Sequence, residues 1–275
     1  MRALHNLTRH LTLAALGAAV LVITGCSGLP DKTDETATWG SQKLYSEAQD
    51  AVVSKDWANC VKYFETLEGR DPFGPFAQQA ELDVAYCNWR DNEQDAAMTA
   101  ITRFIKLHPD HPSIDYAYYL KGLITFNDDL GVFGRFSHQD MSERDPQALR
   151  ESYDSFKLVV DKFPQSKYAP DAAQRMRFIV NALASHEVHT AQYYYNRGAY
   201  LAAVNRAQTA VETYRNAPAI EDALHIMVES YQQLGQTKLA DDTQRVLAAT
   251  FPDSVYLPGN GGKRQVKSNP WYQIW

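Results

Sequence analysis

Apolar residues recur along most of the chain at intervals of three and four positions, and alternation of apolar and polar residues is scarce. The first spacing is typical of an amphipathic α-helix, and the second would be typical of a β-strand. Prolines fall between the helical stretches: Pro72 and Pro109 are 37 residues apart, and Pro218 and Pro252 are 34 apart. Each of these prolines closes a stretch long enough for two helices. The pattern predicts an all-α array of helical hairpins.

Five such units are expected within residues 39–257, followed by a flexible tail over 258–275 with an aromatic end. Small residues stand where the two helices of a hairpin would cross, as at Ala48, Ala203 and Ala240, and large apolar residues flank them. This arrangement resembles the tetratricopeptide repeat of about 34 residues, and it implies a solenoid of about five helical hairpins. The expected units are 39–72, 76–109, 113–164, 169–218 and 219–252.

Local signals mark several helix ends. Asp145 followed by Pro146 is typical of an N-cap with proline in the first turn, and Asp171 is a candidate cap for the fourth unit. Residues 171–197 contain no helix breaker before a glycine, so we expect one long helix there. The third unit holds a long insertion, 127–145, in which we expect an exposed apolar tip that contacts a partner.

The amino terminus resembles a lipoprotein signal. Arg2 and Arg9 precede an apolar run over 11–23, which is short for a membrane span, and the run ends in Ile-Thr-Gly-Cys26. This resembles the lipobox of bacterial lipoproteins, which implies cleavage after residue 25 and acylation of Cys26. Ser27 in place of Asp implies the outer membrane. Residues 26–38 are expected to form a flexible tether.

Charge and composition exclude other classes. Removal of residues 1–25, which carry two Arg and no acid, changes the formal charge from −6 to −8. An acidic chain without a basic cluster argues against nucleic-acid binding. No phosphate loop, nucleophile elbow or paired-carboxylate motif stands out, so neither a reaction nor a cofactor is expected. His186 and His189 are spaced one residue too closely for a zinc-protease motif, and no metal site is expected.

Several segments resemble the BamD family of lipoproteins, which belong to the β-barrel assembly machinery. Residues 70–80, RDPFGPFAQQA, resemble the link between the first two repeats of that family, although Asp71 replaces its usual Tyr. Residues 143–146 and 163–169 resemble its R-D-P and Y-P-x-S-x-Y-A segments. Residues 193–206 resemble its Y-Y-x-x-R-G-A and V-N-R segments. The likeness extends over nearly the whole chain after the signal.

The resemblance implies a non-enzymatic lipoprotein, anchored by lipid to the periplasmic face of the outer membrane. Its partners would be the barrel insertase, through the periplasmic domains of that protein, accessory lipoproteins, and unfolded outer-membrane proteins. An alternative is a tetratricopeptide lipoprotein that assists pilus or secretin assembly. A third hypothesis, an enzyme acting on cell-wall material, lacks a catalytic constellation. The segments 70–80 and 193–206 favour the first hypothesis.

Substrate recognition is expected on the first helices of the units. An aromatic-lined groove there would suit an apolar, aromatic-ended peptide. The alternative, that many of these side chains are buried packing residues, stays open, because an aromatic stripe at helical spacing is often core. The groove residues expected in the first three units are Tyr45, Gln49, Val52, Leu82, Tyr86, Trp89, Tyr119, Leu123 and Phe126.

Three further residues carry expectations. The resemblance implies that Arg206, in the V-N-R segment, contacts the insertase, and the guanidinium suits a bidentate bond to an acid. The alternative is a solvated Arg on a helix face. Cys60 and Cys87 belong to helices that would be neighbours in an oxidising compartment, so a disulfide and two buried thiols both remain open. The aromatic end of the tail, 270–275, is expected to dock on a partner or on this protein.

Overall fold

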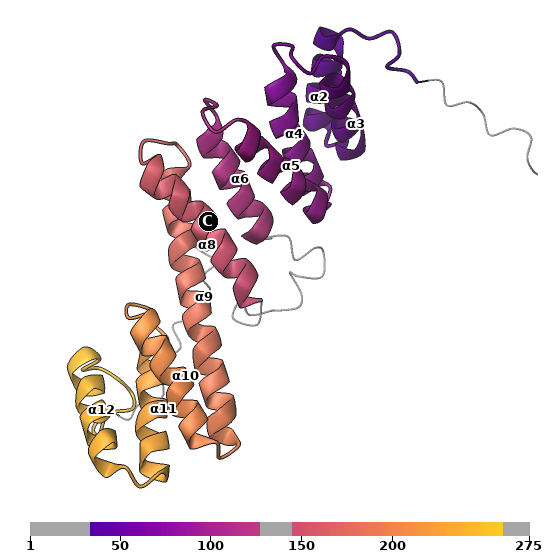
Figure 1. Cartoon of the computed structure of the whole chain (residues 1–275). Helices are drawn as coiled ribbons and strands as arrows, with labels where there is room; N and C mark the ends of the chain where they lie inside the picture. The colour runs from indigo at the N-terminus through magenta and orange to yellow at the C-terminus, as the bar shows by residue number, and fades with distance from the viewer. Residues whose placement is uncertain (1–33, 127–144, 261–275) are drawn as a thin grey trace, which may run out of the picture.

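The computed structural model describes residues 34–126 and 145–260, and the regular structure within them is entirely α-helical. This confirms the all-α prediction. Figure 1 shows the helices stacked in chain order into an elongated array, with α2 and α12 at opposite ends. The helices are α2 (Ser41–Ser54), α3 (Trp57–Arg70), α4 (Ala77–Arg90), α5 (Gln94–Leu107), α6 (Ile114–Phe126), α8 (Pro146–Lys162), α9 (Ala169–Asn196), α10 (Tyr200–Thr213), α11 (Ile220–Gln233) and α12 (Thr237–Thr250).

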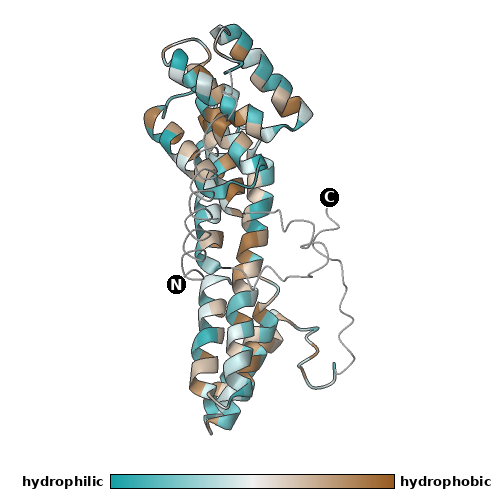
Figure 2. Ribbon diagram, turned by 90° about the vertical axis from the view of Figure 1, so that its right-hand side faces the viewer, coloured by the Kyte–Doolittle hydropathy of each residue, from teal (hydrophilic) through white to brown (hydrophobic). Residues whose placement is uncertain are grey.

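Consecutive helices pair as five hairpins, α2 with α3, α4 with α5, α6 with α8, α9 with α10, and α11 with α12. Each hairpin lies within one of the five units expected from the proline spacing. Apolar side chains repeat on one stripe of each helix, as Cys60, Tyr63, Phe64 and Leu67 do on α3. Figure 2 accordingly shows apolar and hydrophilic residues interspersed along the helices. None of the described helices is long and apolar enough to span a membrane.

Helix α9 connects the two halves of the array. Its 28 residues correspond to about 42 Å of helix. Residues from Ala169 to Leu183 pack in a core with α6 and α8, and residues from Ala184 to Ala191 pack in a second core with α10 and α11. The long uninterrupted helix expected over 171–197 is therefore the element that both cores share, and Figure 1 shows it as one continuous helix.

Helices α6 and α8 approach each other closely at Gly122. A β-carbon there would lie 2.6 Å from the ring of Phe156, which is fully buried. The buried Ser152 hydroxyl donates a hydrogen bond to the Gly122 carbonyl oxygen across the same contact, at 2.9 Å. Asp145 caps α8 by accepting a hydrogen bond from the Gln147 N–H, with Pro146 in the first turn, as the sequence predicts.

The links that follow the second helices share one conformation, which explains the positions of Pro72, Pro109, Pro164 and Pro252; Pro218, in contrast, is the fifth residue of its link. In each link a backbone N–H donates to the carbonyl oxygen three residues earlier, as from Gly74 to Asp71, from Ser166 to Phe163 and from Ser254 to Phe251. Four of the five links have proline as their second residue, where no N–H is used by this turn. After the last link the left-handed Gly259 (φ +94°) turns the chain away from a helical path.

Helix α12 carries polar residues at positions where the equivalent helix of the preceding hairpin carries apolar ones. Tyr214 and Phe251 open equivalent links, so Val204 and Ala207 of α10 correspond to Asp241 and Gln244 of α12. The two α10 residues are buried, whereas Asp241 is exposed and Gln244 is partly exposed. A terminal repeat needs a polar outer face, because no further repeat covers it. The fifth hairpin therefore has the composition of a terminal cap.

The segment before α2 is held against α3, although it was expected to belong to a flexible tether. The Arg70 guanidinium binds the Asp34 carboxylate at 3.2 Å and the Thr36 hydroxyl at 2.9 Å, and Lys62 binds Glu35 at 2.8 Å. The prediction of a flexible tether over 26–38 is therefore wrong for residues 34–36, which make these bonds. Residues 1–33, the insertion over 127–144 and the tail over 261–275, including Cys26, lie outside the described residues.

Candidate interaction surfaces

A stripe of tyrosines lines one face of the first three hairpins. We define this tyrosine face as Tyr45 on α2, Tyr86 on α4, Tyr116 and Tyr119 on α6, and Tyr168 before α9. All five are partly exposed. The Tyr168 ring stacks on Tyr119 with centroids 4.8 Å apart and lies 5.2 Å from Tyr116. The rings are therefore held in place before any ligand arrives, which reduces the entropy cost of binding.

Six of the nine predicted groove residues lie at the surface, and three do not. Tyr45, Gln49, Val52, Tyr86, Trp89 and Tyr119 are partly exposed. Leu82 is fully buried in the core of the first hairpins, so its assignment to the groove was wrong. The assignments of Leu123 and Phe126 were wrong as well, because both are buried in the core that α6 forms with α8 and α9.

A partly buried carboxylate interrupts the apolar character expected of this face. Asp83 accepts hydrogen bonds from the Gln79 side chain at 2.9 Å and from the Gln49 side chain at 3.3 Å. Burial raises the pKa of Asp83 to about 6, and the two amide donors oppose that shift. Burial also raises the pKa of the neighbouring Tyr45, and the Asp83 charge adds to this effect. The face thus combines rings with a hydrogen-bonding acid.

A second polar group lies where the tyrosine face meets α9. The Tyr119 hydroxyl donates a hydrogen bond to Asp171 at 2.7 Å, and Arg175 binds the same carboxylate at 2.7 Å. Burial raises the pKa of Tyr119 to about 12, and the bond to Asp171 adds to that shift. Asp171 was expected to be an N-cap, but α9 begins at Ala169, so this carboxylate lies inside the first turn and binds α6 instead.

The sequence interpretation missed Gln79, Asp83, Tyr116, Tyr168 and Asp171. On α4 the partly exposed stripe beside the tyrosine face consists of Gln79, Asp83 and Tyr86, at spacings of four and three residues. The sequence pattern instead favoured Leu82 for the groove, but Leu82 lies about 100° around the helix from Asp83 and is buried in the core. Polar residues at helical spacing beside a tyrosine were the signal available in the sequence.

Arg206 lies on α10 and is held by an acid from α9. Its guanidinium binds the Glu187 carboxylate at 3.3 Å, and the Arg206 side chain is half exposed while the Glu187 side chain is only 8% exposed. Arg206 lines an open cleft of about 420 Å³ together with Tyr194, Ala202, Asn205 and Thr209. A guanidinium has five N–H donors in a fixed fork, so Arg206 retains donors for a ligand while Glu187 orients it.

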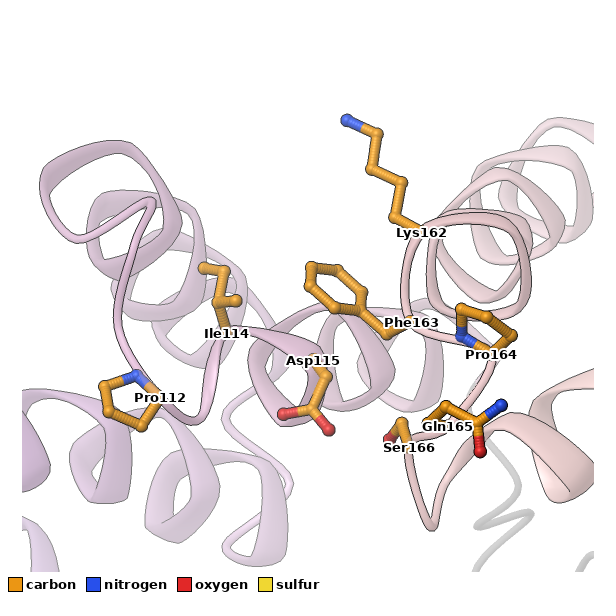
Figure 3. Close-up of a pocket in the computed structure, with 8 residues that line it drawn as sticks. All are labelled: Pro112, Ile114, Asp115, Lys162, Phe163, Pro164, Gln165 and Ser166. Atoms are coloured by element: carbon orange, nitrogen blue, oxygen red, sulfur yellow. The ribbon is translucent and has the colours of Figure 1, made fainter.

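A different cavity, of about 390 Å³, separates two proline links (Figure 3). One wall comes from the link before α6 and the start of that helix, and the other comes from the end of α8 and the link before α9. Figure 3 shows the Phe163 ring lying toward Ile114, and the Lys162 side chain extending away from the other residues. The lining residues are Pro112, Ile114, Asp115, Lys162, Phe163, Pro164, Gln165 and Ser166. None of the predicted groove residues lines this cavity.

Cys60 and Cys87 are joined by a disulfide that connects α3 to α4, with their Cα atoms 6.1 Å apart. Both residues are fully buried. The bond ties the first hairpin to the second beside the tyrosine face. Phe76 of the intervening link stacks on Tyr45 at 4.6 Å, whereas Phe73 of the same link is 99% exposed.

Among the described residues, no group of three or more His, Cys, Asp or Glu side chains is arranged to hold a metal ion. The polar groups of the tyrosine face are hydrogen-bonded to one another rather than directed at a common point. This geometry suits recognition of a chain segment by rings and hydrogen bonds.

The architecture defines a class, the proteins built from tetratricopeptide-type hairpins that bind other proteins along a solenoid. Within this class the chain belongs to the outer-membrane lipoprotein family YfiO, which matches residues 39–256. An outer membrane protein assembly factor BamD from Neisseria meningitidis serogroup A is 44% identical over 258 residues, covering 93% of this chain and 96% of the relative. These matches confirm the family predicted from the sequence motifs.

Two further relatives come from other genera. The outer membrane protein assembly factor BamD of Xylella fastidiosa strain Temecula1 is 36% identical and covers 90% of this chain and 84% of its own length. The outer membrane protein assembly factor BamD of Vibrio cholerae serotype O1 is 33% identical, and the match covers 87% of this chain and 98% of the relative. The likeness therefore extends over the whole array and associates this chain with the outer membrane and its protein assembly complex.

Proposed function

We propose that this protein is a lipid-anchored scaffold of outer-membrane β-barrel assembly, acting at the periplasmic face of the membrane. The observation that carries the proposal is the 44% identity to an outer membrane protein assembly factor across nearly all of both chains. The lipobox-like segment that ends at Cys26 supports the anchor. The scaffold would hold the barrel insertase through the periplasmic domains of that protein, bind accessory lipoproteins, and catalyse no reaction.

In this proposal, one surface binds unfolded substrates and another binds the insertase. The tyrosine face would receive segments of unfolded outer-membrane proteins, because aromatic rings and hydrogen-bonding groups alternate along it. The acids Asp83 and Asp171 on this face favour backbone N–H groups and side-chain donors of the segment over a terminal carboxylate. Arg206, at the other half of the array, would bind an acid of the insertase.

Affinity capture from detergent-solubilised envelopes tests the function. The tagged protein, with its lipid anchor intact, should retain a β-barrel insertase in near-equal amount. Capture of a secretin or of pilus components without the insertase would overturn the proposal in favour of the alternative assembly role. Intact-mass analysis of the same sample measures acylation of Cys26 separately.

Charge-removing variants test the Arg206 contact. Arg206→Gln alone leaves the buried Glu187 without its partner, so a fold defect could lower binding indirectly. The double variant Glu187→Gln with Arg206→Gln removes both charges and should unfold like the parent. We expect it to weaken insertase binding about ten-fold or more, because a charge-assisted contact is lost. Unchanged affinity of the double variant would contradict the role of Arg206.

A further inference from the structure

Helix α12 carries two exposed apolar side chains on one side. Leu239 is 42% exposed and Val246 is 49% exposed. They are seven residues apart, so they share a face of the helix, with the partly exposed Thr243 between them. We call these three residues the α12 stripe. Leu239 lies about 160° around the helix from Asp241, so the stripe and the polar cap are different surfaces.

The repeat architecture does not account for Leu239 and Val246. The links that follow the second helices define the equivalent positions on α3, α5, α8 and α10, and none of those helices carries a large apolar residue at both positions. The equivalent pairs are Asn59 and Thr66, Ala96 and Arg103, Glu151 and Leu158, and Ala202 and Thr209. Among the described helices, α12 packs extensively against α11 alone. The stripe is therefore open to a contact that the described helices do not make.

The chain leaves the described array beside the end of α12. The Tyr256 ring stacks on His225 of α11 with centroids 3.9 Å apart, and the Tyr256 hydroxyl donates a hydrogen bond to Asp222 at 2.6 Å. The Asn260 side-chain amide then donates a hydrogen bond to the Pro252 carbonyl oxygen at 2.8 Å. The segment that follows Asn260 therefore starts from a fixed point near the C-terminal end of α12, and Val246 lies one turn before that end.

Residues 261–275 have the composition and the length to cover the stripe. Four of the last five residues are large aromatic or aliphatic ones: Trp271, Tyr272, Ile274 and Trp275. Trp271 comes eleven residues after Asn260. A chain of that length spans at most about 36–40 Å, whereas the whole of α12 is about 21 Å long. The aromatic residues can therefore reach any position along the stripe.

Opposite charges favour the same pairing. Residues 261–275 contain three basic side chains and no acidic one, whereas residues 220–260 contain six acidic and two basic side chains. Asp242, which is paired with Arg245, lies beside the stripe, and the exposed Asp253 lies in the link after α12. The basic residues stand between Asn260 and the aromatic end, at Lys263, Arg264 and Lys267. A basic segment that starts beside an acidic surface is attracted to it.

We propose that the segment 261–275 folds back along α12 and docks its aromatic residues on the α12 stripe. Burial of Leu239 and Val246 under these rings removes apolar surface from water, and the basic residues lie against the acidic surface of the last hairpin. The same chain is favoured as the occupant over a second copy, because a short connection gives an effective concentration on the order of millimolar. This inference is independent of the proposed function.

The test measures disulfide formation in the full-length lipidated protein in detergent micelles. Thr243→Cys with Gln273→Cys places one thiol in the stripe and one in the aromatic end. Ala248→Cys with Gln273→Cys is the matched control, because Ala248 is exposed on the same helix but lies about 140° around it from Thr243. Peptide masses identify the bond, and mixing with ¹⁵N-labelled copies distinguishes a bond within one chain from a bond between two. Thermal unfolding shows that each variant is folded.

We expect the stripe pair to form its bond about ten-fold faster than the control pair, because docking concentrates the second thiol on one side of the helix. Adding Leu239→Asn and Val246→Asn should lower the rate to that of the control pair. Adding Leu107→Asn, which changes a 59% exposed leucine on α5, should leave the rate unchanged. Equal rates for the two pairs, or a rate that the stripe substitutions leave unchanged, would overturn the proposal. A bond that joins two copies would also overturn it, because a second copy would then cover the stripe.

Discussion

At the residue scale, the tyrosine face depends on carboxylates that the protein keeps in partly buried positions. Asp83 has two side-chain amide donors, and Asp171 has a hydroxyl and a guanidinium. Burying a carboxylate costs free energy unless such bonds compensate for the lost water. The raised pKa of Asp83 shows that its two neutral donors compensate only in part. An acid retained at such a cost is a candidate for ligand binding.

This cost predicts a pH-dependent stability. Because the pKa of Asp83 is about 6 in the folded protein and 3.8 ordinarily, the native state binds the proton more tightly than the unfolded state. Its contribution to the free energy of unfolding therefore falls as pH rises between those two values and stays low above about 6. Asp83→Asn should be more stable than the parent at about pH 8, and the gain should vanish near pH 4. Urea unfolding at both pH values measures this.

A matched acid controls for nonspecific charge effects. Asp50→Asn changes an exposed acid on α2, and it should leave the free energy of unfolding nearly unchanged at both pH values. A gain for Asp83→Asn that is equal at the two pH values would contradict the assignment of the titration to this carboxylate.

At the scale of elements, the first two hairpins are joined more tightly than the others. The disulfide connects α3 to α4, and stacking of Phe76 on Tyr45 joins the same two hairpins on the tyrosine face. The remaining described hairpins are joined by packing and hydrogen bonds, as the bonds from Gln94 to the Ile124 carbonyl oxygen and from Tyr119 to Asp171 illustrate. The tyrosine face of the amino-terminal half therefore lies beside a covalent cross-link between its first two hairpins.

Removing this cross-link should lower stability. The two cysteines are 27 residues apart, and closure of a loop of this length stabilises the folded state by about 3 kcal/mol in the chain-entropy account. Cys60→Ala with Cys87→Ala should lower the free energy of unfolding by roughly that amount, measured by urea unfolding of the double variant. Titration of the unreduced, denatured parent should detect no free thiol from this pair. Two titratable thiols would exclude the bond.

At the scale of the whole molecule, α9 determines how the two halves are related, because it contributes to the core of each. The tyrosine face belongs to the first half and the Arg206 cleft to the second. The two surfaces to which we assign binding in the proposed function are therefore related through α9. On α12, the exposed Asp241 and the partly exposed Gln244 place polar side chains at the positions where α10 packs against the next hairpin.

The cap can be tested by restoring the residues of the preceding hairpin. Asp241→Val with Gln244→Ala places on α12 the residues that α10 carries at the equivalent positions, Val204 and Ala207. We expect this variant to associate as concentration rises, because an apolar helix face becomes exposed. Sedimentation equilibrium measures the association. The control, Asp253→Val, changes an exposed acid of the following link and should leave the mass unchanged.

Local patterns along the chain determined the helices, their order and the family. Helical spacing, proline at the second position of four links, and the motifs at 70–80 and 193–206 all depend on near neighbours in sequence. The resemblance at 193–206 also implied an insertase contact for Arg206, which stays a prediction, and the sequence left the disulfide between Cys60 and Cys87 open. Such signals can be read from the sequence because each hairpin of a repeat array contacts mainly the hairpins next to it in the chain.

Only the tertiary structure decided which side of each helix is free. Leu82, Leu123 and Phe126 have the right period for a groove, but α4 is packed on two sides and α9 covers the end of α6, so all three are buried. The same packing leaves Tyr168 partly exposed on the tyrosine face and Asp83 partly exposed beside it. A helix in a stack packs against neighbours on two or more faces. The period of its apolar residues shows which residues share a face, but not whether a neighbouring helix covers that face.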